Sequence, residues 1–254
     1  MEDETYKYSL KSVVRAFKVV ELLAERKCAL RTAEIASALD LPDGTLHRFL
    51  RTLEDLGYVA QVPERREYGL TCRFLDVANS VILQGGTFDA VLPYMKLFVH
   101  RYGFDTSLHQ FHNNQVYIIH TISLLPYSTT SKNFLCGRLE HTHSLAAGKI
   151  LLATLSDDAL ERYLDQEILF PRTRYTITNK DVLRQEIMGV REKGYAEVHE
   201  EFDEGTIALA VPLRKASGEI TGALSFRATK MEADVMFGEE TIRDIVEALT
   251  NVRI

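Results

Sequence analysis

The sequence predicts an α+β protein of two domains: an N-terminal winged helix-turn-helix and a C-terminal domain built on an antiparallel sheet. Three observations support this prediction. Two short helical patterns and a hairpin follow one another between residues 30 and 70. Beyond residue 86, strand patterns come in pairs joined by tight turns, as in antiparallel sheets. The length of 254 residues suits two domains, and at 46% hydrophobic residues the chain can bury a core.

A first helix is predicted over residues 9–23. Val13, Phe17, Val20 and Leu23 recur at helical spacing, so we expect them to face the core. Arg15 lies off this apolar stripe and should be exposed.

Two further helices are predicted to form a helix-turn-helix. The first covers residues 32–39, and the second follows Pro42, which we expect at the first helical position because its missing N–H costs nothing there. Gly57 is expected to provide the left-handed C-terminal cap. The core-facing positions of the second helix form a stripe of Leu46, Phe49, Leu50 and Leu53.

The other face of this second helix is polar and cationic. In a helix-turn-helix the second helix enters the DNA major groove with its N-terminal residues near base edges. We therefore expect Thr45, His47 and Arg48 nearest the bases and Arg51 on phosphates, with Gly44 at the start of the helix. The alternative is an αα-corner whose arginines are merely solvated.

A hairpin follows, with strands at residues 58–62 and 67–70. Its turn carries Arg65 and Arg66. Such a wing would point cations at the DNA backbone on the same surface as Arg15, which favours DNA binding over the solvated alternative.

Residues 71–86 are predicted to be a linker helix that stops at Gly85 and Gly86, so the expected domains are residues 1–70 and 87–254 on either side of it. Asn113 and Asn114 suit a hairpin turn because asparagine tolerates positive φ. In the second domain we predict helices at 87–102, 145–155, 159–164, 180–193 and 239–252, and strands at 107–111, 115–121, 207–213 and 220–227.

The charge of the first domain is only weakly basic. Residues 5–75 hold twelve Lys and Arg against nine Asp and Glu, a net charge of +3 in a chain of net charge −6. One such module should bind DNA modestly, so we expect a homodimer or a dimer of dimers on a pseudo-palindromic stretch of double-stranded DNA. The apolar linker face (Leu75, Ala78, Ile82) would make the contact; the alternative is a monomer in which this face packs on its own wing.

Cys28, Cys72 and Cys136 are far apart and form no Cys-x-x-Cys pair, which suggests a reducing compartment. The sequence has no signal peptide pattern and no apolar run of membrane-spanning length. We therefore expect a cytoplasmic protein without a membrane partner.

Several blocks in order resemble the IclR family of bacterial transcriptional regulators along essentially the whole chain. The resemblance implies a winged helix domain, a linker helix, a GAF-like effector domain and assembly as dimers or dimers of dimers. It also implies repression or activation of catabolic operons in response to an organic acid. The matching blocks are residues 12–16, 34–36, 45–53, 57–59, 68–70, 143–153, 194–196, 200–201, 205, 210–212 and 223–225.

The resemblance implies an effector site in the second domain. Ala146 and Ala147 would offer backbone N–H groups to a carboxylate at a helix N-terminus, and Ser225 would contact the ligand. This chain departs from the family in having Val198 for an acidic residue and Ala208 for a frequent cysteine. Both departures remove polar groups and argue against a very small, fully polar ligand.

Arg227 is a third departure, standing in place of a second serine. Strand alternation puts it on the face of Ser225, opposite Leu224 and Phe226, where its guanidinium could bind a carboxylate in bidentate fashion. The alternative is that it turns to solvent or pairs with Glu200 or Glu201. We expect a carboxylate with a non-polar or aromatic body first and a sugar acid second.

A fourth departure lies at the start of the helix-turn-helix. Arg31 occupies a position where the family often has a capping Thr or Ser, so Thr32 is expected to cap the helix one residue later. We include both among the residues facing DNA.

The alternative function is a metal-binding or catalytic sensor domain with a non-functional helical module. It rests on six histidines of the second domain. His109 and His112 are three residues apart and cannot share one face of a strand, whereas His141 and His143 could. The Ala146–Lys149 segment lacks the glycine and the Ser or Thr of a phosphate-binding loop. We therefore expect neither an enzyme nor a cofactor. The six histidines are His109, His112, His120, His141, His143 and His199.

Overall fold

A computed structural model describes residues 10–123, 136–250 and 252. It divides into two compact units, Met1–Ile82 and Leu83–Ile254. The two units are described separately below.

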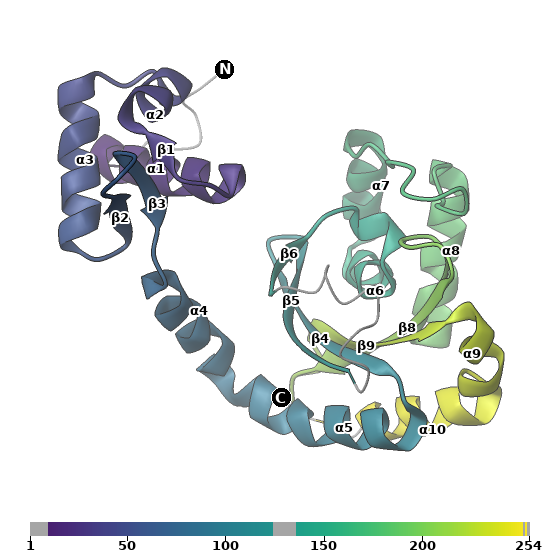
Figure 1. Cartoon of the computed structure of the whole chain (residues 1–254). Coiled ribbons are helices and arrows are strands. Elements are labelled where there is room, and N and C mark those ends of the chain that lie inside the picture. Colours follow the sequence, from purple (N-terminus) through teal and green to yellow (C-terminus); the bar gives the residue numbers. More distant parts are fainter. Residues whose placement is uncertain (1–9, 124–135, 251, 253–254) are drawn as a thin grey trace. The chain divides into compact units, whose positions relative to one another are not determined.

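The N-terminal unit is a winged helix-turn-helix, as predicted (Figure 1). Its three strands form an antiparallel sheet in the order β1-β3-β2. The short strand β1 was not predicted, because two residues are too few for an alternation pattern. In chain order the elements are α1 (Lys11–Arg26), β1 (Leu30–Arg31), α2 (Thr32–Leu39), α3 (Asp43–Asp55), β2 (Val59–Val62) and β3 (Glu67–Leu70).

The core of this unit corrects the prediction for α1. Val13 and Phe17 do not face the core: their exposed fractions are 49% and 59%. The buried residues of α1 are Val19, Leu22 and Leu23, which pack against Ile35 of α2 and against the predicted α3 stripe. The helix therefore has two apolar faces, and only one of them is covered within this unit.

The helix ends confirm one prediction and correct two. Gly57 follows α3 with φ +79°, as expected for a left-handed cap. Pro42 is the N-cap of α3 rather than its first helical residue. Thr32 is not the cap of α2 either, because the helix begins with it and Arg31 is the N-cap. There the Glu34 carboxylate accepts a hydrogen bond from the Arg31 backbone N–H at 2.7 Å.

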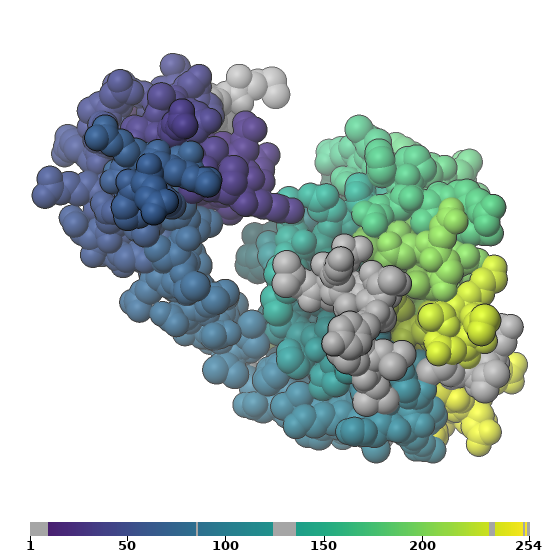
Figure 2. Space-filling model, viewed as in Figure 1, coloured from purple at the N-terminus to yellow at the C-terminus, as the bar shows by residue number. Residues whose placement is uncertain are grey.

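Helix α4 (Arg73–Leu83) follows the wing and is succeeded by a 3₁₀ turn, η1 (Gln84–Gly86), at the end of the predicted linker. No residue of α4 is buried, and its atoms lie at the surface in the space-filling view (Figure 2). Leu75, Val77 and Val81 are each about half exposed or more. The helix thus carries an apolar surface that is not covered.

The C-terminal unit is built on one six-stranded antiparallel sheet in the order β6-β5-β4-β9-β8-β7. Asn113 and Asn114 both have positive φ in the β4–β5 turn, as predicted. The short edge strands β6 and β7 were not predicted. The strands are β4 (Asp105–His112), β5 (Gln115–Ile122), β6 (Gly137–Leu139), β7 (Ala196–His199), β8 (Thr206–Arg214) and β9 (Ile220–Thr229).

Helices cover both faces of this sheet (Figure 1). Leu224 and Phe226 of β9 belong to the core formed with α5 and α10, whereas Ala223 points to the opposite face, which α6 covers. Strand alternation predicted this division. The helical elements are α5 (Thr87–Tyr102), η3 (Thr142–Ser144), α6 (Ala146–Thr154), α7 (Asp157–Gln166), α8 (Lys180–Lys193), α9 (Lys230–Met236) and α10 (Glu239–Thr250).

Candidate functional site

The outer face of α3 is the first candidate site. Leu46 and Leu50 are fully buried on one side of this helix, so the opposite side is held toward solvent. His47, Arg48 and Arg51 are exposed there. Within the described residues no carboxylate forms an ion pair with either arginine. The face therefore presents uncompensated positive charge, as a phosphate backbone requires.

The structure brings Arg15 of α1 next to the start of α3. Arg15, Thr45 and Arg48 line one surface hollow, together with Ser12, Phe49 and Thr52. Gly44 is exposed, and no atom lies within 4 Å of the position of an added Cβ. The N-terminal end of α3 is thus open to a large partner.

The wing carries its two arginines at the tip of the hairpin. Both Arg65 and Arg66 are exposed, and Arg66 adopts a left-handed conformation with φ +53°. Arg31 lies on β1, where its Nε is 3.8 Å from a Glu67 carboxylate oxygen of β3. Its charge is therefore partly compensated, and Thr32 beside it is half-buried.

The second candidate site is a cavity of about 60 Å³ against the sheet face that α6 covers. All five residues expected at the effector line it: Ala146, Ala147, Ala208, Ser225 and Arg227. An engineered core cavity that holds benzene measures about 150 Å³. The expected ligand with a substantial apolar body therefore meets a cavity of less than half that size. The remaining lining residues are Ser107, His109, Leu139, Ser144, Leu145, Val198, Phe202, Asp203 and Thr206.

The first turn of α6 supplies donors to this cavity. The first intrahelical backbone bond runs from the Lys149 N–H to the Leu145 carbonyl, and Leu145 makes no side-chain cap. The N–H groups of Ala146 and Ala147 precede that bond and remain available. Gly148 is required just behind them, because an added Cβ would lie 1.8 Å from the Thr142 carbonyl oxygen.

The floor of the cavity is polar because two neighbouring strands place small hydroxyls there. Ser107 of β4 lies opposite Ser225 of β9 in the register. His109 Nε2 is 2.7 Å from Ser225 Oγ. Burial lowers the pKa of His109 to about 4, so the imidazole is neutral at pH 7. Alternation could have placed Ser107 and His109 on one face, but the pairing of β4 with β9 is not visible in the sequence.

Arg227 neither turns to solvent nor pairs with Glu200 or Glu201, the alternatives considered from the sequence. Its Nη2 donates to Asp105 Oδ2 at 2.7 Å across the β4–β9 pair, and only 13% of its side chain is exposed. Glu200 and Glu201 pair with Lys230 and Lys149 instead. The guanidinium therefore lines the cavity with its charge compensated by Asp105.

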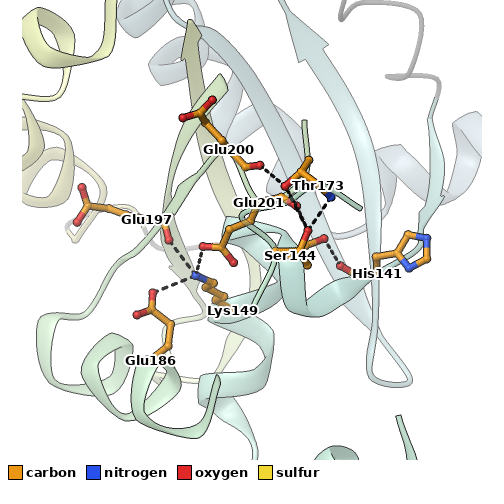
Figure 3. A network of polar contacts seen from close by, with 9 residues as sticks. His141, Ser144, Lys149, Thr173, Glu186, Glu197, Glu200 and Glu201 are labelled. Carbon is orange, nitrogen blue, oxygen red and sulfur yellow. Dashed lines mark hydrogen bonds and ion pairs between the residues drawn. The ribbon is translucent and has the colours of Figure 1, made fainter. Parts of the chain in front are cut away.

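The Lys149 ammonium is engaged in buried ion pairs and is not available to bind a phosphate. Its side chain is 1% exposed, and its ammonium donates to Glu201 Oε1 at 2.7 Å, Glu186 Oε1 at 3.0 Å and the Glu197 carbonyl at 3.3 Å (Figure 3). Burial raises the pKa of Glu201, although the neighbouring lysine opposes the shift. This ion pair ties α6 to α8 and to the segment after β7.

The segment after β7 is held by hydroxyls and by a second ion pair. Thr173 Oγ1 donates to the Glu200 carbonyl and Thr176 Oγ1 to the Glu201 carbonyl, both at 2.6 Å. Figure 3 shows the contact of Thr173 with the Glu200 carbonyl and the separate bond from Ser144 to the His141 carbonyl. Glu200 itself adopts φ +59° and pairs with Lys230 at 2.5 Å. Glu200 and Glu201 thus anchor the segment whose neighbouring residues Val198, Phe202 and Asp203 line the cavity.

Among the histidines of the C-terminal unit, His141 and His143 lie close together, with ring centroids 6.3 Å apart. His109 is buried in the cavity floor, His112 is exposed, and His143 Nε2 donates to the Phe170 carbonyl oxygen at 3.2 Å. Among the described residues, no group of three or more His, Cys, Asp and Glu side chains is placed to hold a metal ion. Within the same residues, no helix combines the length and hydropathy needed to cross a membrane.

Comparison with known proteins agrees with this architecture. Residues 84–251 match the C-terminal domain of bacterial IclR transcriptional regulators, and residues 12–63 match the IclR helix-turn-helix domain. The chain is 27% identical over 233 residues to the probable transcriptional regulator SauR of Cupriavidus necator, covering 91% of this chain and 92% of that protein. It is 27% identical over 241 residues to KdgR of Escherichia coli, covering 95% and 89%.

A solved structure of similar fold contains a ligand. This is an IclR homologue from Microbacterium hydrocarbonoxydans in complex with 4-hydroxybenzoate, with a TM-score of 0.72, 22% identity and coverage of 94% of this chain and 99% of that one. The two family domains together match most of the present sequence, in the order and with the folds described above. The chain belongs to the IclR family of bacterial transcriptional regulators and is a DNA-binding protein of that family.

Proposed function

We propose that this protein regulates a catabolic operon by binding a pseudo-palindromic operator through α3 and a small organic acid through the cavity beside α6. The observation that carries the proposal is the uncompensated cationic face of α3, opposite a fully buried Leu46–Leu50 stripe. A helix exposed in this way in a winged helix-turn-helix is suited to the major groove.

Within the DNA interface the residues divide by position. Thr45, His47 and Arg48 sit at the start of α3 and would be nearest the base edges, with Gly44 allowing close approach. Arg51 lies one turn further and would contact phosphate. The remaining phosphate contacts would come from Arg15 and the wing arginines Arg65 and Arg66, and from Arg31 and Thr32 at the start of α2.

The effector would be a small carboxylate. Helix N-termini bind anions through free N–H groups, and Ala146 and Ala147 provide two of them at the cavity. The ligand named for the Microbacterium homologue is an aromatic acid, which supports the carboxylate class. Since the present cavity is smaller than one that holds benzene, a short acid fits it directly, whereas an aromatic acid requires its walls to move.

The working unit would be a homodimer or a dimer of dimers. A groove of about 500 Å³ on the N-terminal unit is lined by apolar side chains of α1, α3 and α4. Phe17 and Leu56 are each 59% exposed in it. Exposed apolar patches of this kind mark protein interfaces. A dimer would present two of the weakly basic DNA-binding units to one operator.

Sedimentation tests this assembly. Wild type at micromolar concentration should sediment above the 28.9 kDa of one chain, and Phe17→Asp should shift it toward the monomer. Met231→Asp is the control, since Met231 is 93% exposed but lies on α9 in the other unit. A wild-type protein found only as a 28.9 kDa species would refute the dimer.

A mobility-shift titration tests the proposed function. The full chain is titrated onto the DNA upstream of its own gene and onto unrelated DNA at a fixed salt of about 0.1 M, because affinity depends steeply on salt. We expect a specific complex with the upstream DNA that the correct acid strengthens or weakens. No complex at any protein concentration would contradict the operator assignment.

A further inference from the structure

His109 and Ser225 form a buried pair in the cavity floor. His109 is 4% exposed, and its Nε2 lies 2.7 Å from Ser225 Oγ. The two residues come from adjacent strands and share one face of the sheet, where both line the cavity. The other ring nitrogen, Nδ1, is buried and has no hydrogen-bond partner among the described residues.

This arrangement favours one tautomer of the imidazole. If the proton is on Nδ1, a buried N–H is left without an acceptor. If the proton is on Nε2, only a lone pair on Nδ1 is left without a donor. Unpaired buried N–H groups are the rarer defect in proteins. The ring is neutral because burial lowers its pKa to about 4, so His109 carries a single proton. Since Nδ1 lacks an acceptor, this proton lies on Nε2, and the Nε2–H donates to Ser225 Oγ.

The direction of the Ser225 hydroxyl follows from that tautomer. Once Ser225 Oγ accepts the His109 N–H, its own proton is free to be donated elsewhere. The neighbouring Ser107 hydroxyl already pairs with Thr121 Oγ1 at 2.9 Å. Because Ser225 lines the cavity, as Ala146 and Ala147 do, its proton can be donated to a ligand there.

We propose that His109 is a positioning residue which fixes Ser225 as a hydrogen-bond donor, so that the site selects an acid carrying a carbonyl oxygen, rather than a hydroxyl, next to its carboxylate. The proposal rests on the proposed binding of a small carboxylate in this cavity. A carbonyl oxygen only accepts hydrogen bonds and is satisfied by Ser225. A hydroxyl in the same place must also donate, whereas Ser225, Ala146 and Ala147 offer it donors. The Asp203 carboxylate, which also lines the cavity, is already paired with Arg172 at 3.5 Å.

The tautomer is measured first, without any ligand. Full-length protein labelled with ¹⁵N-histidine gives ring nitrogen shifts that distinguish the two tautomers, and His109→Gln assigns the His109 signals. We expect a neutral ring protonated on Nε2 at pH 7. A ring protonated on Nδ1, or an imidazolium, would overturn the proposal. Because this measurement needs neither acid nor DNA, it is independent of the proposed function.

Selectivity is measured next, by calorimetric titration with 2-oxobutanoate and 2-hydroxybutanoate, since the chain contains no tryptophan for fluorescence. We expect wild type to prefer the oxo acid about tenfold, the ratio that follows from one unpaired donor. His109→Leu and Ser225→Ala should both bring the ratio close to one. His109→Gln keeps an N–H near the Nε2 position and should retain the preference.

The control variant is His112→Leu, an exposed histidine three residues along the same strand, which should leave the ratio unchanged. Thermal unfolding of each variant checks that it is folded. A ratio that survives in His109→Leu, or a preference for the hydroxy acid, would overturn the proposal. If neither acid binds wild type, the selectivity claim fails, and the mobility-shift titration decides separately whether the regulator assignment fails with it.

Discussion

The cationic side chains of α3 and those of the C-terminal unit differ in exposure and in ion pairing. On α3, Arg48 and Arg51 are exposed, and no described carboxylate pairs with them. In the C-terminal unit, Arg227 and Lys149 are largely buried, and each is paired with a carboxylate at 2.7 Å. The first surface offers net charge and the second offers directional hydrogen bonds.

This difference matches the two classes of partner. A polyanion is attracted by charge that is not compensated, and the binding gains from counterion release. A small ligand in a buried cavity is recognised by oriented donors, and an uncompensated cation there would pay a large desolvation penalty. The exposed, unpaired arginines of α3 therefore suit a polyanion, whereas the buried, paired cations of the C-terminal unit do not.

The largest effect should come from breaking the buried pair. Lys149→Met removes the only described cation paired with Glu201 and leaves that carboxylate buried, so the free energy of unfolding should fall by about 3–5 kcal/mol. Arg184→Met is the matched control: it removes solvent-accessible ion pairs with Glu161 and Asp181, so it should lower the free energy of unfolding much less. Urea unfolding measures both, and equal losses would contradict the contrast.

Acidification should destabilise the cavity floor through His109. The unfolded chain binds a proton near pH 6.5, whereas the folded chain binds it only near pH 4. The free energy of unfolding is therefore unaffected by His109 above pH 6.5. It falls by about 3 kcal/mol as the pH is lowered toward 4, because the unfolded chain binds the proton first. His109→Gln should flatten the dependence of unfolding free energy on pH over this range. An unchanged slope would show that His109 is not buried in neutral form.

Arg48→Ala should change which DNA sequence is preferred. Loss of a bidentate contact to guanine costs about 1–3 kcal/mol and relaxes one base position. Arg51→Ala, expected to lose a phosphate contact, should weaken all sequences alike. Competition binding over single-base operator variants separates the two, and unchanged discrimination in Arg48→Ala would make the base-reading assignment wrong.

The smallest effect is expected at the wing. Arg65→Ala should weaken specific and non-specific binding equally and reduce the slope of log K against log salt by about 0.9 for each lost phosphate contact. Arg174→Ala, an exposed arginine of the C-terminal unit, should leave the slope unchanged. A normal slope in Arg65→Ala would remove the wing tip from the DNA interface.

Much of the fold follows from local patterns. Residues 180–193 were predicted as a helix and form α8 with the same bounds. The Asn113–Asn114 turn and the Gly57 cap also follow from conformations that few residues adopt. The two apolar faces of α1 could not be separated in this way, because Val13 and Phe17 have the same helical spacing as core residues. Only the packing partners decide which face is covered.

The two candidate sites also differ in how far local sequence patterns could predict them. The α3 face consists of residues close in sequence, so its composition was visible directly. The cavity joins segments more than one hundred residues apart, as in the His109–Ser225 pair. Four of its lining residues were expected from the family resemblance and Arg227 from strand alternation, but Ser107, His109 and the Asp105–Arg227 ion pair depend on the pairing of β4 with β9.

Coupling between acid and DNA tests the central claim most directly. The acid that gives the largest thermal shift is added to the operator titration of the full chain, with Ser225→Ala in parallel. We predict that it changes the operator dissociation constant of wild type by about 5- to 150-fold, the usual range of allosteric coupling, and that Ser225→Ala still binds operator but loses most of this change. An acid that saturates the wild-type cavity and leaves operator affinity unaltered would contradict the claim that this protein is an effector-responsive regulator.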